Sequence, residues 1–534
     1  MNTFFRGVGF GKGPKGGKGP KGPKGPKERR PDCGLLLLRS FASFGSLSPL
    51  RSLLLASILA LAGSSTPAFA QPLKKLDRPE DVRLEDILKR LDGISPYAAM
   101  DLPLKQARNY AASSSDVEPY GGVKPYKEHF MVQMEYTGAG RALPEPEHLT
   151  SVKIGFLGPI SPTVSIATGG KSHNEETLGI AMMRATQLAI EEANARGGYT
   201  RRGIPFELAV KNDNALWGAS GTEVIDLAYK DNAWAIIGGI DGANTHIAIR
   251  VALKIEIPWL TPGDLDPTYI ETNIPWVMRC IGDDRQLNYI LVDYALRKMN
   301  YKRPCIIRSG NRYGRFGVRE IRDGCRRLGR PSVIEMAYKV GAKNFDLQLD
   351  RIAEYNPDVI FHWGNGDDAA HVLNAIRARG WKQPFLTSDR AVSDDFLRIA
   401  GDNAEGVICG FPWNPDRRDP KLDAFRTAFK QRWGVEAETY AAHAYDGANM
   451  LIWAIQTAGL NRAKIRDVLA YRAEAFSGVT GEIPLSSVLD DAGEVFLAIR
   501  EGGRWIYRSR EDLGIPRGQV IAQPRVEREM AAAR

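Results

Sequence analysis

The sequence has few cysteines, and none is spaced to bind zinc or to catalyse redox chemistry. There are five cysteines in 534 residues, and no C-x-x-C pair occurs. Zinc ribbons and thioredoxin-type sites are therefore excluded. Four cysteines lie beyond the leader described below: Cys280, Cys305, Cys325 and Cys409. In an exported protein Cys305 and Cys325 could form a bridge, since they lie at neighbouring ends of a predicted strand–helix unit; the alternative is buried free thiols.

Motifs for catalysis and for nucleotide binding are also lacking. The turn in "IIGGIDGANT" (residues 236–245) has glycines at 238, 239 and 242, which is not the G-x-G-x-x-G spacing of a dinucleotide-binding turn. No H-E-x-x-H or G-x-S-x-G sequence occurs. His173 and His246 have no partner at metal-ligand spacing, and the adjacent Asp367 and Asp368 fit the start of a helix. We therefore expect no enzyme activity, no cofactor and no metal.

Positive charge is concentrated at the N-terminus. Of the 72 lysines and arginines eleven lie in residues 1–70, and of the 63 acids two lie there, so 61 of each sign remain elsewhere. The formal charge of +9 therefore belongs to this leader. A role in binding nucleic acid loses its main support.

The leader is typical of an export signal. "LLLASILALA" (residues 53–62) is an apolar run of the length of a signal core and too short to span a membrane, and Arg51 precedes it. Small residues at Ala68 and Ala70 predict cleavage before Gln71. We expect an exported, periplasmic protein, and an uncleaved membrane anchor is the alternative.

The rest of the chain predicts an extension followed by an α/β body. In residues 71–150, "RPEDVRLEDILKRLDG" has helical spacing, "HFMVQMEYTG" alternates like a strand, and "RALPEPEHLT" is a Pro-rich linker. From Val152 to "PFLTSD" (residues 384–389), strand-like and helix-like segments alternate. This pattern predicts two doubly wound, Rossmann-like units with parallel sheets. Two long helices and a hairpin with its turn at Glu501–Gly502–Gly503 follow. "GVICGFPW" (residues 406–413) is interpreted as a strand that crosses between the units.

Small polar loops follow the predicted strands, where ligands bind in doubly wound sheets. They are "GPISPT" (158–163), "GIDGANT" (239–245), "TPGDLD" (261–266), "NRYGRFG" (311–317), "WGNGDD" (363–368) and "SDRAVSDD" (388–395). Backbone N–H groups and hydroxyls in such loops can hold a carboxylate, and an aspartate can pair with an ammonium.

In order and spacing, these segments resemble the periplasmic solute-binding proteins of branched-chain amino-acid transporters, the Leu/Ile/Val-binding type. The resemblance is carried by "VKIGFLGPIS", "GIAMMRATQLAIEEANARGG", "WAIIGGIDGANTHIAIRVALKIEIPWLTPG", "NRYGRFG", "NPDVIFHWGNGDDAAHVLNAIRARGW" and "PFLTSDRAVSDDFLRIAGDNAEGVICGFPW". It implies two lobes joined by three crossing segments, near residues 275–283, 405–413 and 478–488. Lobe 1 would comprise residues 151–278 and about 411–485, and lobe 2 about 279–410 and 486–534.

The resemblance also implies a function: the lobes close over a small amino-acid-like ligand, and the protein delivers it to an ABC permease, acting as a monomer. In that family one turn binds the α-carboxylate of the ligand, and this turn matches Ala243 to Thr245. An acidic residue of the family binds the ligand ammonium, and it matches Asp389. The full set of candidate ligand-binding residues is Ser161, Asp241, Ala243, Asn244, Thr245, Thr261, Gly263, Asp264, Tyr313, Trp363, Asn365 and Asp389.

Three features depart from the family pattern. Asp241 and Asp264 bring negative charge to the place of the ligand carboxylate, "TPGDLD" lacks the expected Ser or Thr after its proline, and Arg390 follows the expected ammonium anchor. An amide, a more cationic amine and an aromatic acid are therefore open as ligands. Two other functions remain: a ligand-sensing receptor or regulator on the same fold, and a periplasmic enzyme or enzyme-accessory protein.

Overall fold

The computed structural model describes residues 134–136, 138–161, 163–164, 171–172, 174–213, 217–471, 475–486 and 488–515. These residues belong to one compact unit, Leu76–Arg534. The export signal, its cleavage site and the predicted helix at residues 78–93 lie outside the described residues. None of the helices within the described ranges is long and apolar enough to cross a membrane.

The first sheet is parallel throughout and has the strand order β4-β1-β5-β6-β7. Its strands are β1 (Val152–Gly158), β4 (Phe206–Asn212), β5 (Ala235–Gly238), β6 (Trp259–Thr261) and β7 (Val277–Arg279). Every residue of β5, β6 and β7 is buried, as expected for a parallel sheet covered on both faces. The register pairs Gly158 with Asn212 and Leu157 with Gly238, so the carboxyl ends of these strands form one edge.

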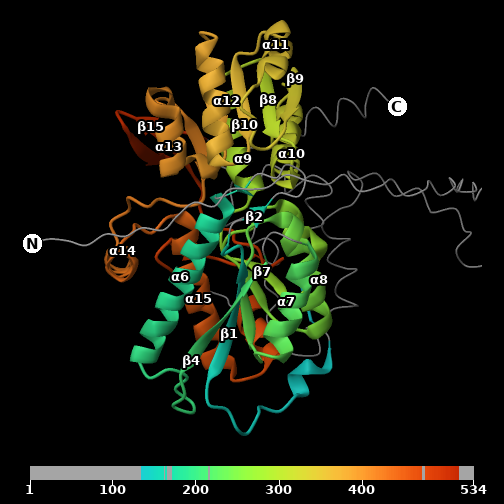
Figure 1. Cartoon of the computed structure of the whole chain (residues 1–534), viewed down its shortest axis with the longest axis vertical. Coiled ribbons are helices and arrows are strands. Elements are labelled where there is room, and N and C mark those ends of the chain that lie inside the picture. The colour runs from blue at the N-terminus through green and yellow to red at the C-terminus, as the bar shows by residue number, and fades with distance from the viewer. Residues whose placement is uncertain are drawn as a thin grey trace, which may run out of the picture. The chain divides into compact units, whose positions relative to one another are not determined.

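Helices cover both faces of this sheet (Figure 1). On one face α6 (Asn174–Ala195) packs with α15 (Thr439–Ala458), and on the other α7 (Trp217–Tyr229) packs with α8 (Gly242–Ile255). The pairing of α6 with α15 joins segments far apart in the sequence. A further helix, α16 (Arg462–Ala470), follows α15 and was not predicted.

The second sheet has the order β16-β15-β12-β11-β10-β8-β9. Its parallel part comprises β8 (Pro304–Ser309), β9 (Ile334–Tyr338), β10 (Val359–Trp363), β11 (Phe385–Thr387) and β12 (Ile408–Phe411). The prediction that residues 406–413 form a crossing strand is wrong, because β12 pairs with β11 inside this sheet and the crossing comes after it. The associated helices are α9 (Asp284–Val292), α10 (Arg312–Arg327), α11 (Asp346–Glu354), α12 (Gly366–Ala378) and α13 (Asp394–Ala400). A π-helical turn (Asp293–Lys298) extends α9.

An antiparallel hairpin completes the second sheet. Strands β15 (Phe496–Glu501) and β16 (Arg504–Arg508) pair with Glu501 opposite Arg504, which confirms the predicted turn. The loop residues Gly502 and Gly503 have φ angles of 57° and 76°. Both lie in the left-handed region that a two-residue hairpin turn of this hand requires, which explains the two glycines.

Within the described residues the chain passes between the two lobes three times: after β7, after β12, and between β14 (Glu482–Ile483) and β15. Helix α14 (Pro420–Trp433) follows the second passage. The residue limits given above for the two lobes stay a prediction.

The last part of the extension packs on lobe 1. The predicted strand at residues 129–138 is wrong where the structure describes it, since Met134–Tyr136 and Gly138 form no strand. A 3-10 turn follows at Ala139–Ala142. Arg141 forms an ion pair with Asp467 of α16, so part of the surface of this helix is covered by the extension.

The four cysteines beyond the leader are buried free thiols. Of the two alternatives that the sequence left open, the structure has the free thiols and not the bridge, although Cys305 and Cys325 do lie in one strand–helix unit, β8 and α10. Burial raises the pKa of both thiols, which keeps them protonated and unreactive.

Candidate functional site

The candidate residues of lobe 1 follow the carboxyl ends of β1, β5 and β6. Ser161 lies just beyond β1, where its Oγ accepts a hydrogen bond from Asn212 Nδ2 at 2.5 Å. Asn212 ends the neighbouring strand β4, and its Oδ1 also accepts from the backbone N–H of Ile160 at 3.1 Å. Ser161 is thus held at the sheet edge by an adjacent strand.

The turn after β5 caps helix α8 with its own aspartate. Asp241 is the N-cap residue, and its Oδ1 accepts from the backbone N–H of Ala243 at 3.2 Å. Thr245 Oγ1 donates to the Asp241 carbonyl at 2.9 Å. Burial raises the pKa of Asp241, while the nearby Arg390 acts to lower it. The Ala243 N–H predicted to hold a ligand carboxylate is therefore already occupied by a carboxylate of the protein.

Asn244 is the residue of this turn whose side-chain amide lacks hydrogen bonds. Its side chain is buried, and neither the amide nitrogen nor the amide oxygen has a hydrogen-bond partner among the described residues. His246, two residues further on, donates from Nδ1 to Gly242 O (2.7 Å), and its Nε2 lies 3.1 Å from Thr268 Oγ1, as in a helix-facing histidine. His173 lies outside the described residues.

The loop after β6 is fixed by the Thr261 hydroxyl. Thr261 Oγ1 accepts from the backbone N–H groups of Gly263 (3.3 Å) and Asp264 (3.0 Å) and donates to Gly239 O at 3.2 Å. Asp264 is buried; its Oδ1 accepts from the Asp266 N–H at 3.0 Å, while Oδ2 has no partner among the described residues. Thr261 and Gly263 therefore shape the loop, and Asp264 carries its unsatisfied charge.

We predict that Asp264 makes stability depend on pH. Burial, and then the neighbouring Asp266, raise its pKa from 3.8 to about 6. The folded protein holds this proton where the unfolded chain releases it, so the stabilisation is full below pH 3.8 and is lost as pH rises through about 6. Relative to the wild type, Asp264→Asn should gain about 3 kcal/mol between pH 3 and pH 7. Urea denaturation across this range checks it, and parallel curves for the two proteins would contradict it.

The candidate residues of lobe 2 follow β8, β10 and β11 in the same way. The Asp389 carboxylate accepts from Tyr313 OH at 3.3 Å and from Tyr440 OH at 2.6 Å. Tyr440 belongs to α15, a helix of lobe 1, so Asp389 is bound from both lobes. Burial raises the pKa of Asp389, and the Tyr440 hydrogen bond and Arg390 act to lower it. The predicted ammonium anchor is present, but its two oxygens are already hydrogen-bonded.

Trp363 ends β10 and is fully buried. Its Nε1 donates to Asp284 Oδ2 at 3.3 Å, and its ring lies 6.2 Å from that of Tyr313. Asn365 is the N-cap residue of α12, and its Oδ1 accepts from Arg390 Nη1. Asp367 and Asp368 lie in the first turn of α12, as predicted.

Two arginines of lobe 2 contact lobe 1 at this place. Arg312 Nε donates to Asp266 Oδ2 at 2.8 Å, and Arg312 Nη2 donates to Thr268 Oγ1 at 2.7 Å. Arg390 Nη2 donates to Ile240 O at 3.5 Å, and its guanidinium carbon lies 3.9 Å from the centre of the Tyr313 ring. The loops from both sheets that carry the predicted residues are thus in contact.

Sequence reasoning missed Asp266, Asp284, Arg312 and Tyr440. Asp266 and Arg312 lie inside loops that were identified as candidates, so a search for opposite charges in those loops would have found them. Tyr440 starts a helix more than 50 residues beyond Asp389, and no local signal connects the two.

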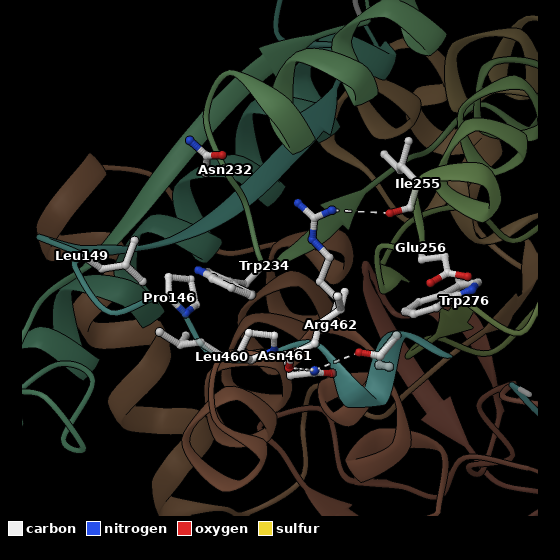
Figure 2. A pocket seen from close by; sticks show the side chains of 14 residues that line it. Pro146, Leu149, Asn232, Trp234, Ile255, Glu256, Trp276, Leu460, Asn461 and Arg462 are labelled. Atoms are coloured by element: carbon white, nitrogen blue, oxygen red, sulfur yellow. Dashed lines mark hydrogen bonds between the residues drawn. The ribbon is translucent and has the colours of Figure 1, made fainter. Parts of the chain in front are cut away.

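A cavity of about 480 Å³ lies at the opposite edge of the first sheet, where the extension covers it (Figure 2). Trp234 precedes β5 and Trp276 precedes β7, so the cavity is at the amino ends of the strands. Arg462, at its centre in Figure 2, donates to the carbonyl oxygens of Ala228 (3.0 Å), Ala233 (2.8 Å) and Ile255 (3.4 Å). It satisfies carbonyl groups at the ends of α7 and α8, so its role is structural.

Metal binding finds no support in the part of the chain that the structure describes, where no group of three His, Cys, Asp or Glu side chains is placed to hold an ion. The geometry is that of two Rossmann-like lobes whose loops meet at the carboxyl edges of their sheets. That arrangement defines a two-lobed ligand-binding protein of the type I periplasmic binding fold.

The chain belongs to the periplasmic binding protein family, whose family model matches residues 151–487. It is 25% identical over 284 residues to the Leu/Ile/Val-binding protein homolog 1 of Brucella abortus (strain 2308), covering 53% of this chain and 75% of that protein. In structure it is similar to a leucine binding protein, LivK, of Thermotoga maritima MSB8, with a TM-score of 0.59, 22% identity and coverage of 67% of this chain and 98% of that one. A solute-binding protein of R. palustris in complex with benzoate gives a TM-score of 0.58 at 18% identity, covering 67% of this chain and 96% of that one.

Proposed function

We propose that the protein is exported to the periplasm, captures a small amino-acid-like ligand between its lobes and delivers it to an ABC permease. The observation that carries this proposal is the meeting of the candidate loops: Arg312 and Arg390 of lobe 2 contact the Asp266 and Ile240 segments of lobe 1. Three chain passages between the sheets would serve as the hinge of closure. The family membership supports a binding role, and the relatives named above are binding proteins rather than enzymes.

The ligand is not fixed by the fold. The structural relatives named above include a leucine-binding and a benzoate-bound protein, which share the fold with this chain at low sequence identity. We place the ligand in contact with the lobe 1 residues Asp241–Thr245 and Asp264 and the lobe 2 residues Tyr313, Trp363, Asn365 and Asp389. Ser161 would border the same site.

Ligand screening tests the proposal. The protein is produced with its leader, purified after export, and scanned by thermal shift and isothermal titration calorimetry against amino acids, amides, amines and aromatic acids. A true ligand at 100 times its Kd should raise the free energy of unfolding by about 2.7 kcal/mol. Asp389→Asn should weaken binding, whereas Asp402→Asn, an exposed acid remote from the loops, should not.

Binding of no small solute by a folded sample would overturn the proposed function. The intact mass of the exported protein tests the leader separately, because cleavage before Gln71 removes 70 residues. A mass that retains them would support the uncleaved anchor. Sedimentation tests the expected monomer.

A further inference from the structure

Both head-group positions expected for an α-amino acid are occupied by the protein itself. The Ala243 N–H, predicted to hold the ligand carboxylate, is bound by Asp241 Oδ1 at 3.2 Å. The Asp389 carboxylate, predicted to hold the ammonium, accepts two tyrosine hydroxyls. A zwitterion would therefore have to displace a carboxylate at one end and two hydroxyl groups at the other.

The charge around the site favours a cation. Asp241, Asp284 and Asp389 all lie near a single guanidinium, that of Arg390, which acts to lower the pKa of each of them. The other arginine that reaches across, Arg312, is already paired with Asp266. Asp284 and Asp389, which are both buried, thus have this one cation beside them, and Asp241 shares it as well as being close to Arg312. A ligand carboxylate would bring another negative charge into a desolvated site in which burial already raises the pKa of the acids, and this is strongly unfavourable.

Asp284 offers a free acceptor at this place. It is buried at the start of α9, where its backbone N–H donates to Leu265 O in the candidate loop of lobe 1 at 2.9 Å. Its Oδ2 accepts from Trp363 Nε1 at 3.3 Å, whereas Oδ1 has no hydrogen-bond partner among the described residues. Burial raises the pKa of Asp284, and the neighbouring Asp389 and Asp266 raise it further. A buried acceptor without a partner is costly, and a donor from a ligand would remove that cost.

We propose that the site takes a cationic amine without a carboxylate, an ammonium or guanidinium compound whose charged group binds Asp284 Oδ1 beside Asp389. The face of Tyr313, which now holds the Arg390 guanidinium, and the neighbouring Trp363 supply aromatic surface for such a cation. This inference rests on the proposed function, because it names the ligand class of the same site. The Arg390 guanidinium would then compete with the ligand cation for the same carboxylates.

Matched pairs of compounds test the ligand class. Each amino acid is compared with the amine left after loss of its carboxylate: leucine with isoamylamine, arginine with agmatine, lysine with cadaverine and phenylalanine with phenethylamine. In at least one pair, isothermal titration should give an amine that binds about ten-fold or more tightly than the parent amino acid. Tighter binding of the amino acid in every pair, or of benzoate, would overturn the ligand class and leave the proposed function standing. Failure of every compound to bind would instead count against the proposed function.

Three variants test the residues. Asp284→Asn keeps the shape of the side chain and should weaken the amine by about ten-fold or more. The control Asp402→Asn should leave the affinity unchanged. Arg390→Gln removes the competing cation and should tighten amine binding, and it keeps the test decisive if Asp284→Asn does not fold. Unchanged amine affinity in a folded Asp284→Asn protein, or weaker amine binding in Arg390→Gln, would contradict the assignment.

Discussion

Replacing Arg279 with methionine is expected to lower the free energy of unfolding by about 3–5 kcal/mol. Arg279 ends β7 and is fully buried. Its Nε and Nη2 donate to the two carboxylate oxygens of Asp490 at 2.7 and 2.9 Å, and Nη2 also lies 3.1 Å from Asp283 Oδ2. Methionine would leave these two buried carboxylates without their main counter-charge. Urea denaturation at pH 7 measures the loss.

The same change should also weaken the candidate site. Arg279 Nη1 donates to the carbonyl oxygens of Asp264 (3.1 Å) and Asp266 (2.9 Å), which holds the loop after β6 in place. The matched control is Arg379→Met, since Arg379 pairs with the largely exposed Asp346 and Asp350. That control should cost no more than about 1 kcal/mol. Equal losses in the two variants would show that the buried arrangement is not what stabilises this part of the molecule.

A single methyl group at Gly317 is expected to cost about 1–3 kcal/mol of stability and to reduce ligand binding. Gly317 lies in α10, and a Cβ added there would be 2.0 Å from both Cδ1 and Nε1 of Trp363. The indole is fully buried and cannot move without losing its hydrogen bond to Asp284. Urea denaturation and calorimetry with the ligand found by screening measure the two effects.

Gly221→Ala is the control for this substitution. Gly221 lies inside α7, and its added Cβ would meet nothing closer than 3.6 Å, from Val251. There the better helix propensity of alanine should stabilise the protein by as much as about 1 kcal/mol. If Gly317→Ala behaved like Gly221→Ala, the close approach of α10 to Trp363 would not be a constraint on the site.

Most of the fold could be predicted from sequence because its elements are long and periodic. Buried strands such as β5 and amphipathic helices such as α6 carry their pattern locally. The strand predicted at residues 129–138 failed where it is described, because its alternation is not matched by a partner strand there. The assignment of β12 failed for a related reason: which sheet a short buried strand joins depends on neighbours distant in the sequence. The nine-residue helix α16 was not predicted.

The site could be predicted only as a set of loops. Asp241, Asp264 and Asp389 do lie beyond the carboxyl ends of strands, and their contact with a ligand stays a prediction. The sequence could not show that Asp241 caps its own helix or that Tyr440 reaches Asp389, because these contacts depend on side-chain direction and on packing between lobes. From the sequence, Asp241 brings negative charge to the position expected for a ligand carboxylate. The structure accounts for this charge, because Asp241 caps α8 and lies near Arg390.

The pairing of α6 with α15 has a consequence for the order in which the chain can fold during synthesis. Helix α6 ends at Ala195, whereas its partner begins at Thr439, so more than 200 residues must emerge before the apolar face of α6 is covered. The second sheet is completed even later, because its strands β15 and β16 are synthesised after all the others. Neither half can close early, and the nascent chain stays without its finished core until near the end. An unfinished core of this kind would suit the proposed export, in which the polypeptide stays unfolded until it has crossed a membrane channel.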